Sequence, residues 1–447
     1  MQQSTNHRRS NRRRLAAVTG SILAAALSLP GGAAAASPDS APVTAASLGL
    51  MQGFPPPADK RVTRDNFMEY PYSRWAFQHI RELQPTRDIF RGEGSVAPLA
   101  PRPVDLDTLK FDVPGDRQLD LKTWLAESVT DAFLVLHRGE LVYERYFNGM
   151  ARTSQHQMFS ATKSFVGMLV LCLIEEGAID PGKTLQDYIP ELKGSGFGDA
   201  TVQQVLNMTT SLAFNEDYTD PEADVWKYGY VFGIATPPAG YTGASSIYEF
   251  LPALGPAERA HGEAFLYATP NTDVLGWLSS RVTGKSVSRQ LQERVWQQLG
   301  VERDGYMWLN ELGEEMAGGG LNITAADAAR FGQMILHKGQ YNGRQILPEA
   351  VARRILQAGN PEPFNRYYND IWYEQIGYAY HDQWWTFNNP HKAVSAIGVH
   401  GQFIYIDPVA EMVIVKQSSH PEAESMANEV DGPLIWQAIA EHLMGQP

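Results

Sequence analysis

Two β-hairpin patterns, which lie far apart in the chain, constrain the fold of this 447-residue protein more than any other feature. In each, two apolar or aromatic runs flank a short turn, which is the signature of paired antiparallel strands. The expected strands are residues 132–136 and 141–146 in the first hairpin, and 402–407 and 412–417 in the second. A sheet that joins both hairpins would have to be built from both ends of the main domain.

The residues between the hairpins are mainly helical in pattern. Apolar residues recur with helical spacing and end at glycine or polar positions. The expected helices are residues 165–174, 202–208, 273–282 and 325–336. We therefore predict an α/β (α+β) fold, in which helices flank an antiparallel sheet and a mainly helical part is inserted at roughly 180–345.

The first 36 residues form an expected export signal. Five arginines precede the Ala-rich apolar run 15–29, and three alanines follow at the expected cleavage point. The run is too short and too weakly apolar for a membrane span, although a single membrane anchor is the alternative. We predict a periplasmic or secreted protein with no stable membrane span after signal cleavage. An N-terminal linker or extension would cover 37–115, and the main domain 116–447.

The mature chain is acidic and contains one cysteine. Loss of the five signal arginines takes the formal net charge from −13 to −18, which disfavours nucleic acid and anionic membranes as partners. Cys172 lies in an apolar run, so we expect a buried, inert thiol. The eleven histidines show no metal-binding spacing. We expect no metal, no cofactor and a small-molecule substrate.

The string Met158-Phe159-Ser160-Ala161-Thr162-Lys163 carries the main candidate site. A spacing of three places Ser160 and Lys163 on one helix face, about 5–6 Å apart at Cβ. A desolvated lysine can be neutral enough to take the serine proton, and a helix start directs N–H groups toward a developing oxyanion. The same pattern also arises by chance, with Ser160 as an N-cap and Lys163 as a solvated side chain.

Further segments extend this pattern along the chain. They are Tyr267-Ala268-Thr269, Gly318-Gly319-Gly320-Leu321 with Thr324 as an N-cap, Ile397-Gly398-Val399-His400-Gly401, and Asn215-Glu216-Asp217-Tyr218. Together they resemble the serine β-lactamases and penicillin-binding proteins over most of residues 116–447. The last segment resembles the 6-aminohexanoate-dimer (nylon-oligomer) hydrolase and esterase branch in particular.

The resemblance implies a β-lactamase/transpeptidase-like fold and a serine acyl-transfer mechanism. Ser160 would attack a carbonyl carbon, while Lys163 and Tyr267 accept and return the proton. Which of the two is the general base is left open, because their titrations are coupled. The backbone N–H groups of Ser160 and Val399 would hold the oxyanion.

Additional side chains are candidate substrate contacts. By resemblance, Tyr218 lies on a mobile loop and contacts the substrate's amide, with an ordinary loop tyrosine as the alternative. Thr269 stands where the common pattern has asparagine, and can hydrogen-bond Lys163 or substrate. His420 either lines the site or is a surface histidine. Of the adjacent Trp384 and Trp385, at most one can wall an acyl pocket, because neighbours on a strand face opposite ways.

One departure from the family pattern shapes the predicted function. The neutral edge Ile397-Gly398-Val399 stands where the family has Lys-Thr-Gly, and only His400 could partly supply the missing charge. β-Lactams and cell-wall peptides carry a carboxylate that needs a cation there. We predict an exported serine hydrolase of short amides or esters, similar to 6-aminohexanoate-oligomer hydrolases.

Two other functions stay open at this point. The alternative is a class C-like β-lactamase or D-alanyl-D-alanine carboxypeptidase, and a non-catalytic binding protein of the same fold is a third. The sequence determines neither the natural substrate nor the oligomeric state.

Overall fold

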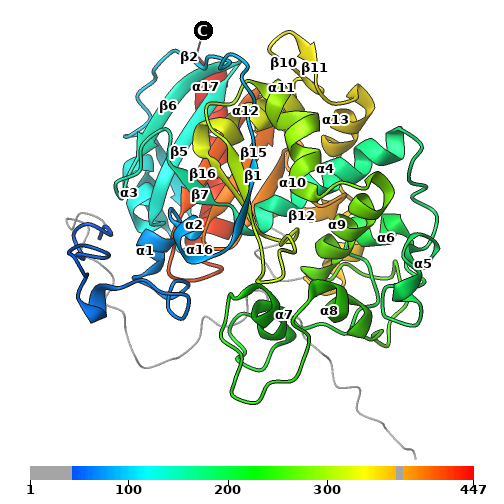
Figure 1. Ribbon diagram of the computed structural model, residues 1–447. Coiled ribbons are helices and arrows are strands. Elements are labelled where there is room, and N and C mark those ends of the chain that lie inside the picture. Colours follow the sequence, from blue (N-terminus) through cyan, green and yellow to red (C-terminus); the bar gives the residue numbers. More distant parts are fainter. Residues whose placement is uncertain (1–42, 369–375, 447) are drawn as a thin grey trace, which may run out of the picture.

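An eight-stranded sheet forms the centre of the protein (Figure 1). The computed structural model describes residues 43–368 and 376–446, so the expected export signal at 1–36 lies outside the described residues. Strand order is β12-β13-β14-β15-β16-β5-β6-β2, antiparallel throughout except that β2 runs parallel to β6. The strands are β2 (Ala100–Pro101), β5 (Thr130–His137), β6 (Glu140–Tyr146), β12 (Tyr378–His381), β13 (Trp384–Phe387), β14 (Val394–Gly398), β15 (Gln402–Asp407) and β16 (Met412–Ser418).

Both predicted hairpins are confirmed, and they pair with each other. The first is β5–β6 and the second is β15–β16. Strand β16 pairs antiparallel with β5, with Ile414 opposite Val135, and this pairing joins the two ends of the main domain. The predicted α/β (α+β) class, with a sheet built from both chain ends, is therefore confirmed.

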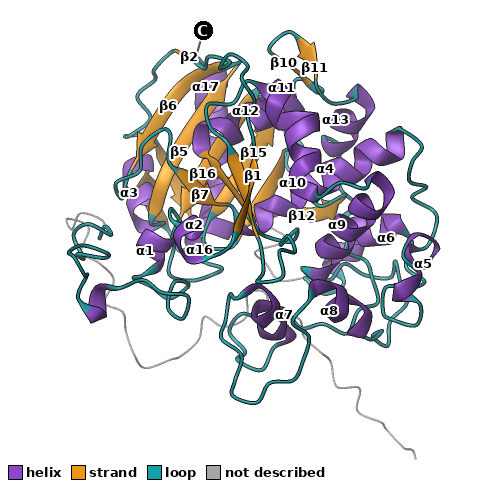
Figure 2. Ribbon diagram, in the orientation of Figure 1, coloured by secondary structure: helices purple, strands orange, loops and turns teal. Residues whose placement is uncertain are grey.

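Helices cover both faces of this sheet (Figure 2). Alternate residues of β5 belong to two separate cores: Leu134 and Leu136 pack in one, and Phe133 and Val135 in the other. The first core lies against α4 and α12, and the second against α3 and α17. These helices are α3 (Leu121–Glu127), α4 (Thr162–Glu175), α12 (Ala325–Leu336) and α17 (Asp431–Met444).

Helix α4 is apolar on all sides because it is buried on all sides. It begins at Thr162, directly after the short helix that carries Ser160. Burial raises the pKa of the Cys172 thiol on this helix to about 12, in accord with the expected inert cysteine. The Ser160 turn is thus attached to a helix that is buried in the core.

The remaining elements surround this frame. Helices α5 to α11 form most of the region predicted as a helical insertion, but that region also contains strands β8 and β9, and α12 packs on the main sheet. Strands β1, β8, β9 and β7 form a second, four-stranded sheet. The bounds are β1 (Thr86–Ile89), β3 (Lys110–Val113), β4 (Arg117–Asp120), β7 (Gln155–Gln157), β8 (Gly305–Trp308), β9 (Leu321–Thr324), β10 (Gln340–Tyr341), β11 (Arg344–Gln345), η1 (Ala58–Lys60), α1 (Ser73–Ala76), α2 (Ile80–Leu83), η2 (Phe159–Ala161), α5 (Leu185–Tyr188), η3 (Pro190–Leu192), α6 (Val202–Leu206), α7 (Asp224–Phe232), α8 (Ile247–Ala253), α9 (Pro270–Thr283), α10 (Val287–Leu291), the π-helix η4 (Gln292–Trp296), α11 (Gln297–Leu299), α13 (Glu349–Ile355), α14 (Pro361–Asn365) and α16 (Met426–Glu429).

The N-terminal segment is a packed extension from residue 43 onward. Phe67 and Phe77 are fully buried in the core that contains α4. Arg74 on α1 forms a buried ion pair with Asp131 on β5 at 2.6 Å and donates to Ser419 at 2.7 Å. This contact fixes the extension to the two strands that join the chain ends. In the parts of the chain that the structure describes, no helix is both long and apolar enough to cross a bilayer.

Replacement of Arg74 should destabilise the protein strongly. Arg74→Ala removes the arginine from the buried Asp131, which keeps only His156 and the Ser419 hydroxyl as side-chain partners, so the free energy of unfolding should fall by about 3 kcal/mol. Denaturation in guanidinium chloride measures this change. Arg353→Ala is the control: its pair with Glu349 is exposed, and its loss should cost under about 1 kcal/mol. Equal losses of unfolding free energy in the two variants would contradict the role of Arg74 in holding the N-terminal extension.

Candidate active site

A sharp turn presents Ser160 at the start of α4. Phe159 has a φ of +44°, which is unusual for a residue other than glycine, and it turns the chain into the short helix η2. The end of β14 lies directly against this turn, because a Cβ added to Gly398 would be only 3.1 Å from the Ser160 nitrogen. The backbone segments of Ser160 and Val399, the predicted oxyanion donors, therefore meet at one place.

Lys163 is buried next to Ser160 and forms a hydrogen bond with it. Its Nζ donates to Ser160 Oγ at 2.8 Å and to the Gly318 carbonyl at 2.7 Å. Burial lowers the pKa of Lys163 from 10.5 to about 8, although Glu216 and Asp273 act in the opposite direction. A minor neutral fraction is therefore accessible near neutral pH, and this form can accept a proton from Ser160.

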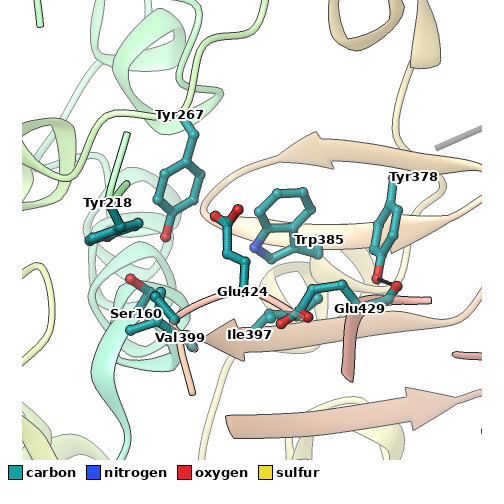
Figure 3. A pocket seen from close by; sticks show the side chains of 11 residues that line it. Ser160, Tyr218, Tyr267, Tyr378, Trp385, Ile397, Val399, Glu424 and Glu429 are labelled. Atoms are coloured by element: carbon teal, nitrogen blue, oxygen red, sulfur yellow. Dashed lines mark hydrogen bonds between the residues drawn. The ribbon is translucent and has the colours of Figure 1, made fainter. Parts of the chain in front are cut away.

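Tyr267 completes the predicted group of three. Its hydroxyl points toward Ser160 (Figure 3), and Lys163 Nζ lies 5.1 Å from the centroid of its ring. Burial raises the pKa of Tyr267 well above its ordinary value, and the interaction with Ser160 lowers it only in part. The tyrosine is therefore protonated, so it can give a proton more readily than it can take one.

Gly318 connects Lys163 to a buried carboxyl group. Its carbonyl accepts from Lys163, and its N–H donates to Asp273 Oδ1 at 3.0 Å. A Cβ at Gly318 would lie 2.7 Å from Asp273 Oδ2, so a larger residue does not fit without displacement. The sequence identified the triple glycine only as part of a structural helix start, and missed this contact with the site.

Glu216 was also missed, and it organises two predicted residues. Its carboxylate accepts from the Tyr218 hydroxyl at 2.8 Å, from the Thr269 hydroxyl at 2.6 Å and from the Thr269 N–H at 2.5 Å. Thr269 was expected to bond Lys163 or substrate, but its hydroxyl donates to Glu216 instead. The only signal was its position two residues before Tyr218, in the segment that resembles the 6-aminohexanoate-dimer hydrolases.

The two predicted histidines lie next to each other but carry no charge. His400 Nδ1 lies 2.8 Å from the His420 carbonyl oxygen, and burial lowers the pKa of each ring to about 4. His400 lines the larger cavity beside Ser160, whereas the residues that line the two cavities do not include His420. A neutral His400 does not replace the cation that the Lys-Thr-Gly strand would supply.

The two adjacent tryptophans face opposite ways, as expected. Trp384 is fully buried in the core, with its ring parallel to that of Phe331. Trp385 lines the site and stacks on Tyr267 with ring centroids 5.6 Å apart. The β13 alternation thus assigns only Trp385 to the site.

Two cavities open on either side of Ser160. The narrower one, of about 60 Å³, is also lined by Tyr267, Trp385, Glu424 and Glu429 (Figure 3). The larger, of about 250 Å³, is mainly apolar; among its walls are Met68, Phe159, Trp226, Ile234, Met316 and His400. Tyr218, Val399 and Ala423 line both. A substrate chain can therefore extend in two directions from a carbonyl held at Ser160.

Comparisons with known proteins place this geometry in one family. The β-lactamase family model matches residues 125–432. The 6-aminohexanoate-dimer hydrolase of Paenarthrobacter ureafaciens is 36% identical over 373 residues, which cover 83% of this chain and 92% of that protein.

Solved structures agree with this placement. A "putative 6-aminohexanoate-dimer hydrolase" from Bacillus anthracis superposes with a TM-score of 0.79 at 34% identity, covering 88% of this chain and 99% of that one. EstCE1, described as a hydrolase with promiscuous acyltransferase activity, has a TM-score of 0.55 at 16% identity, with 71% and 94% covered, and shows the fold alone.

Replacement of Glu216 should destabilise the protein, because this residue accepts hydrogen bonds from two segments of the site. Glu216→Gln keeps only one acceptor oxygen, which cannot serve the Thr269 N–H and the Thr269 and Tyr218 hydroxyls together in the present geometry, so we expect the free energy of unfolding to fall by about 1–3 kcal/mol. Chemical denaturation followed by tryptophan fluorescence measures the change. Glu222→Gln alters an exposed glutamate of the same segment and should have little effect. Similar stabilities for both variants would show that Glu216 is not the organising residue.

Proposed function

The chain belongs to the β-lactamase family, and we propose that it is a serine hydrolase of short linear amides or esters, similar to 6-aminohexanoate-oligomer hydrolases. The observation that carries the proposal is the 2.8 Å hydrogen bond from the buried Lys163 to Ser160, with the Tyr267 hydroxyl directed at the same serine. The three residues come from η2, from α4 and from the segment before α9, and Ser160 lines both cavities.

Acylation begins with proton transfer from Ser160 to neutral Lys163. The Ser160 oxygen forms a bond to the substrate carbonyl carbon, and the carbonyl electron pair moves to its oxygen. The N–H groups of Ser160 and Val399 stabilise that oxyanion. Its collapse breaks the bond to the leaving nitrogen or oxygen, which takes a proton from Tyr267, and the Lys163 ammonium returns a proton to Tyr267.

Deacylation repeats these steps with water. The general base removes a proton from water, the hydroxyl attacks the acyl carbon, and Ser160 leaves with the proton restored. The structure favours Lys163 over Tyr267 as the base, because burial lowers the pKa of the lysine and raises that of the tyrosine. Tyr267 then acts mainly as the acid that reaches the leaving group.

The walls of the site support a substrate without a carboxylate at the reacting centre. His400 is neutral, and the β14 edge carries no basic side chain where the Lys-Thr-Gly strand would supply one. Both β-lactams and peptides that end in D-alanine would leave their carboxylate unpaired here. The 36% identity to a 6-aminohexanoate-dimer hydrolase supports a linear amide instead.

We also propose that the enzyme works outside the cytoplasm. The support is the arginine cluster, the apolar run and the alanines within residues 1–36.

Loss of the nucleophile should abolish turnover. Ser160→Ala should lower kcat for p-nitrophenyl acetate and for 6-aminohexanoate dimer by more than about 10³, because no acyl-enzyme can form. The wild type should react with a fluorophosphonate probe at Ser160, as located by peptide mass spectrometry, and turn over nitrocefin far more slowly than the dimer. Near-native rates in Ser160→Ala, or labelling elsewhere, would refute the assignment.

The activity should rise with pH through the titration of Lys163. The ammonium form cannot accept the serine proton, so kcat/KM for a neutral ester should increase with pH and level off above about 8. Stopped-flow or steady-state assays between pH 6 and 9.5 give the profile. An activity that falls as pH passes 8 would instead indicate that a lysine cation supports a tyrosinate base.

A further inference from the structure

The two segments that carry the proposed oxyanion donors share an unusual backbone conformation. Phe159, which directly precedes Ser160, has a φ of +44°. His400, which directly follows Val399, has a φ of +63°. Residues other than glycine rarely adopt this left-handed conformation, because it crowds Cβ against the backbone, and it persists only where the surroundings enforce it. Each donor therefore depends on the contacts that hold its neighbour.

The rings of these two neighbours pack against each other and against Phe77. The ring centroids of Phe159 and His400 lie 5.3 Å apart. The centroid of the Phe77 ring lies 4.8 Å from that of Phe159 and 5.1 Å from that of His400. All three side chains are buried, and in a close-packed interior no ring of such a group shifts without displacing the others. A single side chain thus contacts the residue beside each donor.

Phe77 is itself fixed to the frame of the protein. It directly follows α1 in the N-terminal extension, and its carbonyl accepts from the N–H of Gln157 on β7 at 2.8 Å. Helix α1 also carries Arg74, whose buried ion pair with Asp131 ties the extension to the central sheet. The Phe77 ring is therefore a fixed support against which the two turns pack.

The main chain of His400 is held by the loop after β16. Its N–H donates to the Ala423 carbonyl at 2.8 Å, and its carbonyl accepts from the His420 N–H at 3.3 Å. These bonds hold the backbone of His400, whereas the ring contacts with Phe77 and Phe159 hold its side chain and couple its turn to that of Ser160.

We propose that Phe77, a residue of the N-terminal extension, is a positioning residue for the oxyanion site. Its ring holds Phe159 and His400 in their left-handed conformations. Those two residues in turn fix the directions of the N–H groups next to them. The inference rests on the proposed function, since these N–H groups matter only if Ser160 forms a tetrahedral intermediate. The residues that line the two cavities do not include Phe77, so it acts through the turns and not on the substrate.

A matched pair of inhibitors measures the oxyanion site separately from substrate binding. The carbonyl carbon of 1,1,1-trifluoro-2-hexanone forms a bond with the Ser160 oxygen, and the electron pair of the carbonyl moves to its oxygen. The tetrahedral adduct thus directs an oxyanion at the two N–H groups. The alcohol 1,1,1-trifluoro-2-hexanol has the same carbon chain but no carbonyl, so it forms no adduct.

Phe77→Leu should weaken binding of the ketone and slow turnover. We expect the inhibition constant of the ketone to rise about tenfold, and kcat and kcat/KM for p-nitrophenyl acetate to fall by about the same factor, because misplaced donors stabilise the transition state less. The inhibition constant of the alcohol should stay within about twofold of the wild-type value. Rates are expressed per active site titrated with a fluorophosphonate, so a loss of folded protein does not mimic the effect.

Phe133→Leu is the matched control. Phe133 is also fully buried, but in the other core, so its truncation should lower the Tm and leave kcat and both inhibition constants unchanged. Equal effects of Phe77→Leu and Phe133→Leu on the ketone would overturn the proposal. So would an equal rise of the inhibition constants of ketone and alcohol in Phe77→Leu. Phe77→Met, with a flexible side chain that fills irregular gaps, gives the same comparison if Phe77→Leu fails to fold.

The wild type and Ser160→Ala separate this inference from the proposed function. If the wild type binds the ketone no more tightly than Ser160→Ala does, no adduct forms, and the proposed function falls together with the inference. If the wild type binds the ketone much more tightly than Ser160→Ala does, the acyl-transfer site is present. Unchanged ketone binding in Phe77→Leu would then overturn the role of Phe77 alone.

Discussion

The burial of Lys163 is the constraint on which the rest of the site depends. An ammonium group inside a protein is costly unless it is hydrogen-bonded, and here its partners are Ser160 Oγ and the Gly318 carbonyl. Those two bonds fix the serine relative to a second segment, and the desolvation lowers the pKa of the lysine. The burial that makes the lysine ammonium costly therefore also suits the lysine to the proposed role of general base.

The carboxylate of Glu216 binds the residue that stands where the common family pattern has asparagine. Thr269 occupies the position of the usual asparagine, and its hydroxyl and N–H both donate to Glu216. Because Glu216 also accepts from Tyr218, the loop over the site and the segment that carries Tyr267 are tied to one group. Where the asparagine of the common pattern is missing, the buried carboxylate of Glu216 thus holds Thr269 in place.

The charge around Ser160 distinguishes this site from one built for carboxylate-bearing substrates. The residues that line the narrower cavity beside Ser160 include Glu424 and Glu429 but no basic side chain, and His400, which lines the larger cavity, is neutral. Burial raises the pKa of both glutamates, so near neutral pH this cavity offers a substrate carboxylate neutral carboxyl groups and no cation. The proposed preference for substrates without a carboxylate therefore rests on the cavity walls.

The sequence by itself determined the elements whose signal is local. The hairpins β5–β6 and β15–β16 followed from apolar runs around turns, and strand alternation indicated that at most one of Trp384 and Trp385 lines the site, which the structure identifies as Trp385. The spacing of Ser160 and Lys163, with the family motifs, identified the candidate group of three residues. Only the tertiary structure decided which side chains share a cavity. Glu216, Gly318 and Glu424 come from loops and Glu429 from the end of α16, and their separations along the chain say nothing of their distances in space. Hydrogen-bond partners and desolvation arise only when such loops pack together, so these roles and the pKa values of the site could not be obtained from the sequence.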